Sequence, residues 1–271
     1  MLEKKINDFP KSFSLFGKVA VLTGASGLLG SEYTKSLCQA GAIVVLADIN
    51  FPKCKKISLE LQKQYPEQTF PIKVDLRKKN SVKKMVMQIM KKYSKIDILI
   101  NNAMYHEGKK EQAVPFEKFP FESWQKVIAV NITGMFLCCQ EIGKIMKKQK
   151  SGVIINISSI YGINGADPRI YGKSGINSSP AYAVTKSAVL NFTRYLAAYW
   201  NNSGIRVNTL SLGGVSNNQE KGFTKKYSHK TMLGRMANKN EYSGAILFLA
   251  SDASSYMTGS NLIVDGGWTS W

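Results

Sequence analysis

Short apolar runs rich in β-branched residues alternate with longer amphipathic segments along the whole chain. The predicted strands are 18–23, 42–47, 69–74, 96–101, 152–158, 205–211 and 261–264. The predicted helices are 28–40, 53–65, 79–93, 121–148, 180–202 and 239–251. Continuously apolar strands that alternate with helices indicate a parallel sheet covered on both faces. The chain is therefore predicted to be an α/β protein with one doubly wound, seven-stranded parallel sheet.

The length and composition fit a single globular domain. With 271 residues, of which 44% are hydrophobic and 20% are charged, the chain can bury a full core. No apolar run approaches the roughly 18 residues that a membrane span needs, and polar residues follow Lys4 and Lys5 where a secretory signal would be apolar. The four cysteines lack metal-ligand spacing. We expect reduced thiols, no metal site and a cytoplasmic location.

Lysine gives the chain a formal net charge of +19. Such a charge could attract nucleic acid or another polyanion. However, arginine, which reads base edges and binds phosphate in a bidentate manner, is much less common here than lysine. The lysine pairs are also dispersed over several predicted helices. We interpret them as a solvated surface and expect no nucleic-acid or membrane partner, while attraction to an anionic substrate stays open.

No repeat, low-complexity tract or linker divides the chain. Residues 1–12 are predicted to be an N-terminal extension, and residues 13–271 to be one domain. Two irregular stretches interrupt the pattern, namely 160–180, rich in Gly, Asn, Ser and Pro, and 213–235, which is polar and lysine-rich. Open α/β sheets bind ligands in loops beyond the carboxyl ends of their strands. We interpret the first stretch as an inserted loop and the second as a substrate lid.

A glycine turn with the sequence TGASGLLG, residues 23–30, joins the first strand to the first helix. Its glycines allow a tight turn and bring backbone N–H groups close to a pyrophosphate. Asp48 ends the second strand, where a carboxylate can bind an adenosine ribose and would repel a 2′-phosphate. No arginine stands in the turn or beside Asp48, so NAD is favoured over NADP. Asp75 could meet the adenine, and Ala103 could pack against the cofactor.

Tyr182 and Lys186 are the strongest candidates for a catalytic pair. Their spacing puts both side chains on one face of a helix, one turn apart. Because an ammonium beside a phenol favours the phenolate, the pKa of Tyr182 is predicted to fall from about 10 toward neutrality. Tyr182 is thus a candidate general acid and base. The two histidines, His106 and His229, lack ligand spacing and are interpreted as surface or loop residues.

These motifs, in this order, resemble the classical short-chain dehydrogenase/reductase family, and the resemblance covers nearly the whole chain. It rests on the glycine turn, residues 101–103 (NNA), Asn131, Ser159, Tyr182, Lys186 and residues 206–208 (RVN). The family implies one Rossmann-fold domain, a nicotinamide cofactor and a homo-oligomer, commonly a tetramer, with a dimer as the alternative.

The resemblance also implies roles for particular residues. Tyr182 would be the catalytic acid and base, and Lys186 would lower its pKa and bind the nicotinamide ribose. Ser159 would polarise the substrate carbonyl, and Asn131 would hold a water in the proton relay. The predicted cofactor-binding residues are Gly24, Ser26, Gly27, Leu28, Leu29, Gly30, Asp48, Ile49, Asp75, Leu76, Asn102, Ala103, Tyr182, Lys186, Gly213 and Val215.

The main departure from the family is a longer separation between Ser159 and Tyr182, with the extra residues around 166–178. Tyr171 lies at the usual separation, but Gly175 follows it where the lysine should be, so it is rejected as the catalytic tyrosine. The insertion carries hydroxyl, amide and charged groups that suit a polyol or a phosphate. Surface elaboration or an oligomer contact is the alternative. In this respect the chain looks like bacterial oxidoreductases of flagellin-glycan and nonulosonic-acid sugar pathways.

Three functions follow from these observations. The first is an NAD(H)-dependent oxidoreductase that interconverts a secondary alcohol and a ketone on a small polar substrate, a sugar derivative. The second is a 3-oxoacyl-carrier-protein reductase, against which Asp48 argues because that reading predicts NADPH. The third is a basic, non-catalytic binding or scaffold protein on the same fold, against which the intact catalytic set argues.

Overall fold

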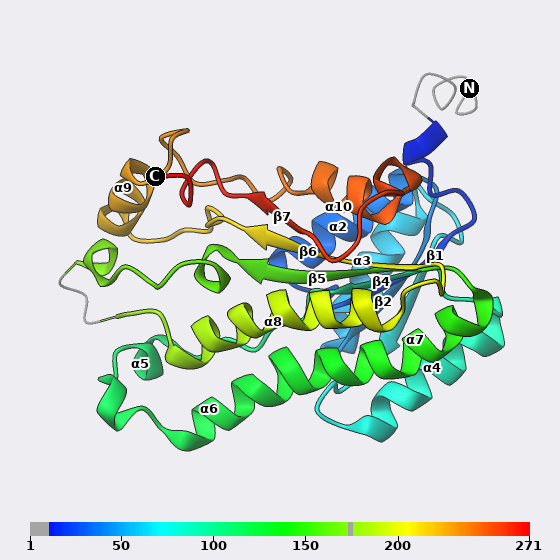
Figure 1. Cartoon of the computed structure of the whole chain (residues 1–271), viewed down its shortest axis with the longest axis horizontal. Coiled ribbons are helices and arrows are strands. Elements are labelled where there is room, and N and C mark those ends of the chain that lie inside the picture. Colours follow the sequence, from blue (N-terminus) through cyan, green and yellow to red (C-terminus); the bar gives the residue numbers. More distant parts are fainter. Residues whose placement is uncertain (1–10, 173–175) are drawn as a thin grey trace.

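The seven strands form one parallel sheet in the order β3-β2-β1-β4-β5-β6-β7 (Figure 1). This computed structural model describes residues 11–172 and 176–271. The strands are β1 (Val19–Thr23), β2 (Ile43–Asp48), β3 (Thr69–Lys73), β4 (Ile98–Asn101), β5 (Gly152–Ser159), β6 (Ile205–Leu212) and β7 (Asn261–Val264). The predicted fold class is confirmed. The strand order reverses between β1 and β4, which places a ligand crevice at their carboxyl ends.

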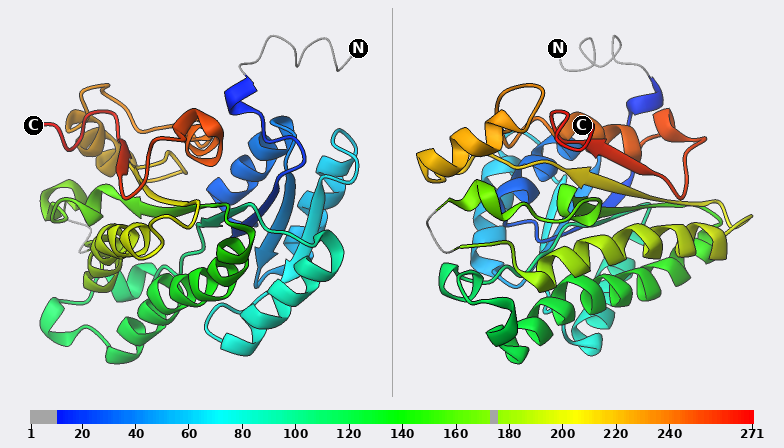
Figure 2. Two further views of the ribbon diagram at one scale, coloured as in Figure 1. Left: turned by 45° about the vertical axis from the view of Figure 1, so that its right-hand side comes forward. Right: turned by 60° about the vertical axis from the view of Figure 1, so that its left-hand side comes forward.

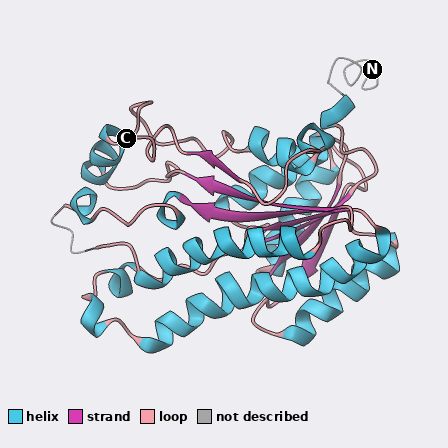
Figure 3. Ribbon diagram, in the orientation of Figure 1, coloured by secondary structure: helices cyan, strands magenta, loops and turns pink. Residues whose placement is uncertain are grey.

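Helices cover both faces of the sheet (Figure 3). The main helices are α2 (Leu28–Gln39), α3 (Phe51–Gln62), α4 (Lys79–Tyr93), α6 (Phe121–Ile128), α7 (Met135–Gln149), α8 (Pro180–Tyr199) and α10 (Ser243–Ala250). Helices α2, α3 and α10 share one core, and α4, α7 and α8 share the other. In β1, Val19 and Val21 face the second core while Ala20 and Leu22 face the first. This alternation across a fully buried strand explains why the strands are apolar throughout.

The long helix predicted at 121–148 is divided into three parts. A π-helix, η3 (Ala129–Gly134), separates α6 from α7. At Gly134 an added Cβ would lie 2.8 Å from the Cβ of Leu76, so only glycine fits this contact. Phe121–Gln149 is long and apolar enough for a membrane span, but 50% of its most apolar window is buried inside the protein, as in a core helix. It is therefore weak evidence for a membrane partner.

Several elements differ from the sequence prediction. The predicted lid contains a helix, α9 (Lys221–His229), and the loop after β4 contains a short helix, α5 (Lys109–Gln112). Helix α10 begins at Ser243, after a turn in which the backbone N–H of Asn238 donates to Glu241. Of the predicted extension, residues 1–10 lie outside the described residues, and η1 (Lys11–Phe13) follows them.

The inserted stretch packs against the lid helix. It contains the 3₁₀ turns η4 (Ile160–Gly162) and η5 (Pro168–Tyr171). Asp167 forms an ion pair with Lys230, just after α9, and the ring centroid of Tyr171 lies 5.4 Å from that of Phe223 in α9. Figure 2 shows this stretch beside α9 in both views. The two irregular segments of the sequence thus form one structure beyond the carboxyl ends of β5 and β6.

Candidate active site

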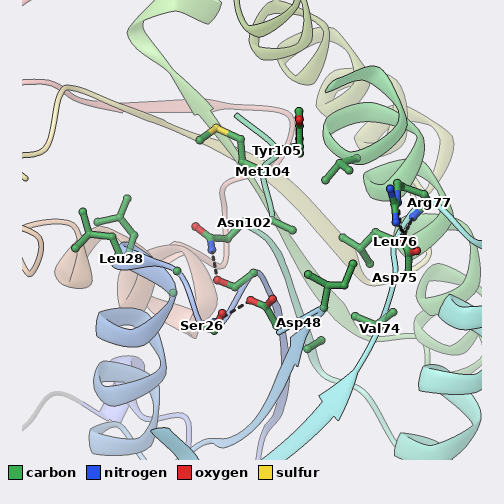
Figure 4. Close-up of a pocket in the computed structure, with 18 of the residues that line it drawn as sticks. Ser26, Leu28, Asp48, Val74, Asp75, Leu76, Arg77, Asn102, Met104 and Tyr105 are labelled. Atoms are coloured by element: carbon green, nitrogen blue, oxygen red, sulfur yellow. Dashed lines mark hydrogen bonds and ion pairs between the residues drawn. The ribbon is translucent and has the colours of Figure 1, made fainter. Parts of the chain in front are cut away.

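A cavity of about 700 Å³ opens at the carboxyl ends of β1, β2 and β4 (Figure 4). It is lined by thirteen of the predicted cofactor-binding residues, namely Gly24, Ser26, Gly27, Leu28, Leu29, Gly30, Asp48, Ile49, Asp75, Leu76, Asn102, Ala103 and Val215. Six further lining positions lie outside that predicted set: Ala47, Val74, Arg77, Met104, Tyr105 and Val130. Among these, Arg77 carries a charge and Met104 fills the place of the family's usual glycine.

The glycine turn is held against the end of β4. An added Cβ on Gly24 would lie 2.7 Å from the Cα of Ala103, and on Gly30 it would lie 2.2 Å from the Gly24 carbonyl oxygen. The side-chain amide of Asn102 donates to the carbonyl oxygens of Thr23 (3.1 Å) and Gly24 (3.2 Å). Gly27, at the start of α2, offers no side-chain cap, so the first N–H groups of the helix stay available for an anion. The turn therefore fits a dinucleotide pyrophosphate.

Asp48 and Arg77 set the charge at the adenosine end of this cavity. Asp48 accepts hydrogen bonds from the backbone N–H groups of Ser26 (3.0 Å) and Asn50 (2.9 Å), which fix its carboxylate at the end of β2. The guanidinium of Arg77 donates to both carboxylate oxygens of Asp75, at 2.9 and 2.8 Å, and holds the pKa of that carboxyl below its usual range. The only arginine that lines the described part of this cavity is therefore paired with a carboxylate already.

A second cavity, of about 750 Å³, adjoins the first and is lined by three of the four predicted catalytic side chains, those of Ser159, Tyr182 and Lys186. The two cavities share the lining residues Leu28, Leu29, Asn102, Met104 and Val215. Ser159, Tyr182, Lys186 and Gly213 line the second cavity only. A dinucleotide in the first cavity would therefore end beside Tyr182.

Helix α8 positions Tyr182 and Lys186 because its start is well capped. The Ser179 hydroxyl accepts a hydrogen bond from the Tyr182 N–H (3.3 Å), and Pro180 occupies the first helical position. Lys186 Nζ lies 5.7 Å from the centre of the Tyr182 ring and donates to the Ile157 carbonyl oxygen at 2.9 Å.

Strand β5 ends at Ser159, whose hydroxyl accepts a hydrogen bond from the Tyr161 N–H (3.3 Å) and lines the cavity together with the phenol of Tyr182. The neighbouring Ser158 faces another way, and its hydroxyl donates to the carbonyl oxygen of Lys186 at 2.7 Å. Gly162 allows this approach, since an added Cβ there would lie 2.5 Å from Ser158 Oγ. The structure thus brings Ser159, Tyr182 and Lys186 into one cavity. Ser158 instead connects β5 to α8 through its hydrogen bond to Lys186.

The prediction for the pKa of Tyr182 was wrong for the protein without cofactor. Burial raises the pKa of Tyr182, although the neighbouring Ser159 hydroxyl acts in the opposite direction. Burial also lowers the pKa of Lys186 to about 8, because the ammonium is removed from water. The sequence spacing correctly predicted a Tyr–Lys pair, but desolvation of both groups outweighs their attraction.

Asn131 lies within the π-helix and lines neither cavity. Its side-chain oxygen accepts from the Tyr105 N–H (2.8 Å), and its amide donates to the Tyr105 carbonyl (3.3 Å). A third contact reaches Thr185 Oγ1 at 3.5 Å. Asn131 therefore joins the loop after β4 to α8 behind the catalytic side chains, and its relay role stays a prediction.

The second cavity is also lined by side chains from the inserted stretch and the predicted lid, which the sequence reasoning placed near the substrate, and from the loop after β4, which it did not. An aromatic wall comes from Tyr161, Tyr171, Phe223 and Tyr227, and a polar wall from His106, Glu107, Gln112 and Asn177. The His106 ring lies 5.7 Å from the Tyr182 ring, so this loop histidine borders the site. Tyr161 could have been found from its place two residues after Ser159, but Glu107 had no sequence signal.

A parallel sheet that holds a dinucleotide-shaped cavity beside a Ser–Tyr–Lys group defines a nicotinamide-dependent oxidoreductase. Residues 24–269 match a family model described as enoyl-(acyl carrier protein) reductase. The chain belongs to the short-chain dehydrogenase/reductase family, whose members act on CH–OH and C=O groups.

Curated relatives include sugar and polyol enzymes. The post-translational flagellin modification protein A of Campylobacter coli is 33% identical over 94% of this chain and 99% of its own. An NAD-dependent glycerol dehydrogenase of Listeria innocua is 34% identical over 96% of this chain and 97% of its own. The likeness extends over nearly the full length of both proteins.

Solved structures agree with the fold and differ in cofactor. A short-chain dehydrogenase of Leptospira borgpetersenii with bound NAD⁺ is 35% identical, covers 96% of each chain and superposes with a TM-score of 0.86. A gluconate 5-dehydrogenase of Burkholderia cenocepacia in complex with NADP and tartrate is 28% identical, covers 96% of this chain and 98% of its own, and has a TM-score of 0.86. Family membership alone therefore leaves both cofactors open.

Proposed function

We propose that this protein is an NAD(H)-dependent oxidoreductase that interconverts a secondary alcohol and a ketone on a small polar sugar derivative. The observation that carries the proposal is that Ser159, Tyr182 and Lys186 line one cavity, which adjoins the glycine-turn cavity, with Lys186 Nζ 5.7 Å from the centre of the Tyr182 ring. The hydroxyls of Ser159 and Tyr182 suit a substrate oxygen that must be polarised and protonated at once.

In the direction of reduction, the Tyr182 hydroxyl donates its proton to the substrate carbonyl oxygen, and the Ser159 hydroxyl donates a hydrogen bond to the same oxygen. Lys186 would hold the nicotinamide ribose, and its charge favours the resulting phenolate of Tyr182. When bound, the nicotinamide ring supplies the hydride and, once oxidised, a positive charge near the phenol. Asn131 is placed to connect this group to the loop after β4, consistent with its predicted relay role.

Asp48 supports NAD as the cofactor. Its carboxylate is fixed by two backbone N–H groups at the end of β2 and lines the first cavity. A 2′-phosphate would meet this negative charge, and Arg77 is paired with Asp75 instead of being free to compensate. The NAD⁺-bound relative from Leptospira and the NAD-dependent glycerol dehydrogenase agree with this assignment.

The lining of the second cavity supports a small polar substrate. Hydroxyl and amide groups line the cavity together with aromatic rings, which suits a molecule that presents both hydroxyl and C–H groups. The NAD-dependent glycerol dehydrogenase is a relative whose name states such a substrate. A cytoplasmic location, a homo-oligomer, and the division into residues 1–12 and 13–271 remain predictions of this proposal.

Replacing Tyr182 by phenylalanine tests the chemistry. We expect Tyr182→Phe to lose turnover by a factor of 10² or more, as for removal of a general acid, and to bind NADH as the unchanged protein does. The measurement is NADH absorbance with a panel of polyols and ketoses, together with fluorescence titration of NADH. Turnover retained in the variant would move the acid and base elsewhere.

The cofactor and the acyl alternative are tested with the same assay. Tighter binding of NADH than of NADPH is expected, and equal or reversed affinity would remove the argument from Asp48. Activity on acetoacetyl thioesters with NADPH, in the absence of activity on polyols or ketoses, would favour the carrier-protein reductase. Salt-resistant nucleic-acid binding without any turnover would favour the scaffold function.

A further inference from the structure

A buried carboxyl group lies in the second cavity. Glu107 is 3% exposed and lines the cavity together with Tyr182. Its Oε1 accepts a hydrogen bond from the Ser179 hydroxyl, whereas Oε2 has no hydrogen-bond partner in the described part of the chain. A buried carboxylate oxygen without a partner is costly. A hydrogen-bond donor from outside the chain is therefore expected to reach it.

The cavity does not share the strong positive charge of the whole molecule. The chain has a net charge of +19, yet Lys186 is the only lysine or arginine among the described residues that line the cavity. The Lys186 ammonium already donates to the Ile157 carbonyl and lies near the Tyr182 ring. An anionic group would therefore meet the carboxylate of Glu107 without a free basic side chain to compensate.

The loop around Glu107 is held by hydrogen bonds. The side-chain amide of Gln112 donates to the Glu107 carbonyl oxygen at 2.7 Å and lies 2.8 Å from His106 Nδ1. His106 Nδ1 in turn lies 2.9 Å from the same carbonyl oxygen. His106 is the other titratable group facing this loop, and its ring borders Tyr182. The carboxylate thus occupies a fixed position in the cavity wall.

Glu107 is linked to the backbone of Tyr182 through one residue, Ser179. The Ser179 hydroxyl donates to Glu107 and accepts from the backbone N–H of Tyr182. A substrate whose carbinol carbon lies at Tyr182 would direct a hydroxyl on a nearby carbon toward Glu107. The aromatic wall formed by Tyr161 and Phe223 would then contact its C–H groups.

We propose that Glu107 determines specificity by accepting a hydrogen bond from a hydroxyl of a neutral polyol or ketose. It would discriminate against substrates that carry a carboxylate or phosphate near that position. This inference rests on the proposed function and narrows its substrate to a neutral, polyhydroxylated class.

The test compares matched pairs, each a neutral polyol and its aldonic acid: glycerol and glycerate, xylitol and xylonate, sorbitol and gluconate. Initial rates with NAD⁺ give kcat/KM for both members. The variants are Glu107→Gln, which removes the charge and keeps the size, and Glu111→Gln, the same change in α5 outside the cavity lining. Glu107→Asp keeps the negative charge but shortens the side chain, so that the carboxylate lies further from the substrate. It is the variant to use if Glu107→Gln fails to fold.

The unchanged protein should prefer the polyol by tenfold or more in at least one pair. Glu107→Gln should reduce that preference at least tenfold, mainly through a higher KM for the polyol, while Glu111→Gln leaves it unchanged. Glu107→Asp should keep the rejection of acids and raise the KM for polyols. Preference for the acid would overturn the proposal. So would an equal fall in kcat on both members of a pair, because Glu107 would then only position α8.

Failure of the proposed function gives a different result. If the unchanged protein oxidises none of the six compounds, the same pairs are titrated calorimetrically into the NADH-bound protein. Polyol binding that Glu107→Gln weakens tenfold supports the specificity role even without turnover. The absence of polyol binding, or binding that the variant leaves unchanged, overturns it.

Discussion

Replacing Lys186 by methionine should make the protein more stable at neutral pH while abolishing its activity. Lys186 is 7% exposed, and burial lowers its pKa from 10.5 to about 8. Each pKa unit corresponds to about 1.4 kcal/mol. At pH 7 the fold therefore pays about 3 kcal/mol to keep this ammonium charged. Loss of the hydrogen bond to Ile157 costs about 1 kcal/mol, which leaves a net gain of about 2 kcal/mol for Lys186→Met.

The pH dependence of the free energy of unfolding tests whether the buried charge of Lys186 causes the higher stability of Lys186→Met. Between pH 8 and 10.5 the unfolded chain holds a proton on Lys186 that the folded protein has lost, so the stability of the unchanged protein rises with pH in this window. At pH 9.5 the cost has fallen to about 1.4 kcal/mol. The advantage of Lys186→Met should accordingly shrink by about 2 kcal/mol between pH 7 and pH 9.5.

Urea unfolding followed by tryptophan fluorescence, at both pH values, measures this difference. Tyrosines and lysines remote from Lys186 titrate equally in both proteins and cancel in the comparison. Lys148→Met, at an exposed lysine of α7, is the matched control and should show little change of its effect with pH. A variant that is less stable at pH 7, or an advantage that is the same at both pH values, would refute the reasoning.

Three further predictions concern other parts of the site. Asp48→Asn should weaken NADH binding roughly tenfold or more and improve NADPH binding, as titration of both cofactors would show; an unchanged ratio of the two affinities would contradict this. Gly30→Ala places a Cβ 2.2 Å from the Gly24 carbonyl oxygen and should lower Tm and abolish NADH binding, whereas Gly165→Ala, with nothing within 4 Å, should do neither. Asp167→Asn breaks the ion pair to Lys230 and should raise the substrate KM by a factor of roughly two to five with kcat nearly unchanged; equal KM values would show that this contact does not shape the cavity.

The sheet and most of its helices could be predicted because their signals are local. The apolar runs predicted all seven strands, and helix 79–93 has the predicted bounds in α4. The spacing of Tyr182 and Lys186 predicted their common cavity. These features follow from the hydrophobic periodicity and the turn-forming residues of a short stretch of sequence, so they can be recognised without knowing the tertiary structure.

What could not be predicted depends on contacts between distant segments. Helix α9 is lysine-rich, and its Tyr227 stacks on Trp268 with ring centroids 4.3 Å apart, a partner that sequence proximity does not reveal. The raised pKa of Tyr182 and the burial of Glu107 follow from the loops that cover them. The π-helix interrupts a pattern that reads as one continuous helix.

The attachment of the inserted stretch to α9 has a consequence for engineering. Asp167, Tyr171 and their partners in and after α9 hold these two segments to each other, whereas the glycine turn and Asp48 belong to the strand ends. Under the proposed function, this side of the substrate cavity and the cofactor cavity are thus encoded in separate parts of the gene, whereas Glu107 lies in a third part, the loop after β4. A library of variants confined to residues 163–171 and 219–230 would change the lining of the substrate cavity and leave the cofactor cavity unchanged.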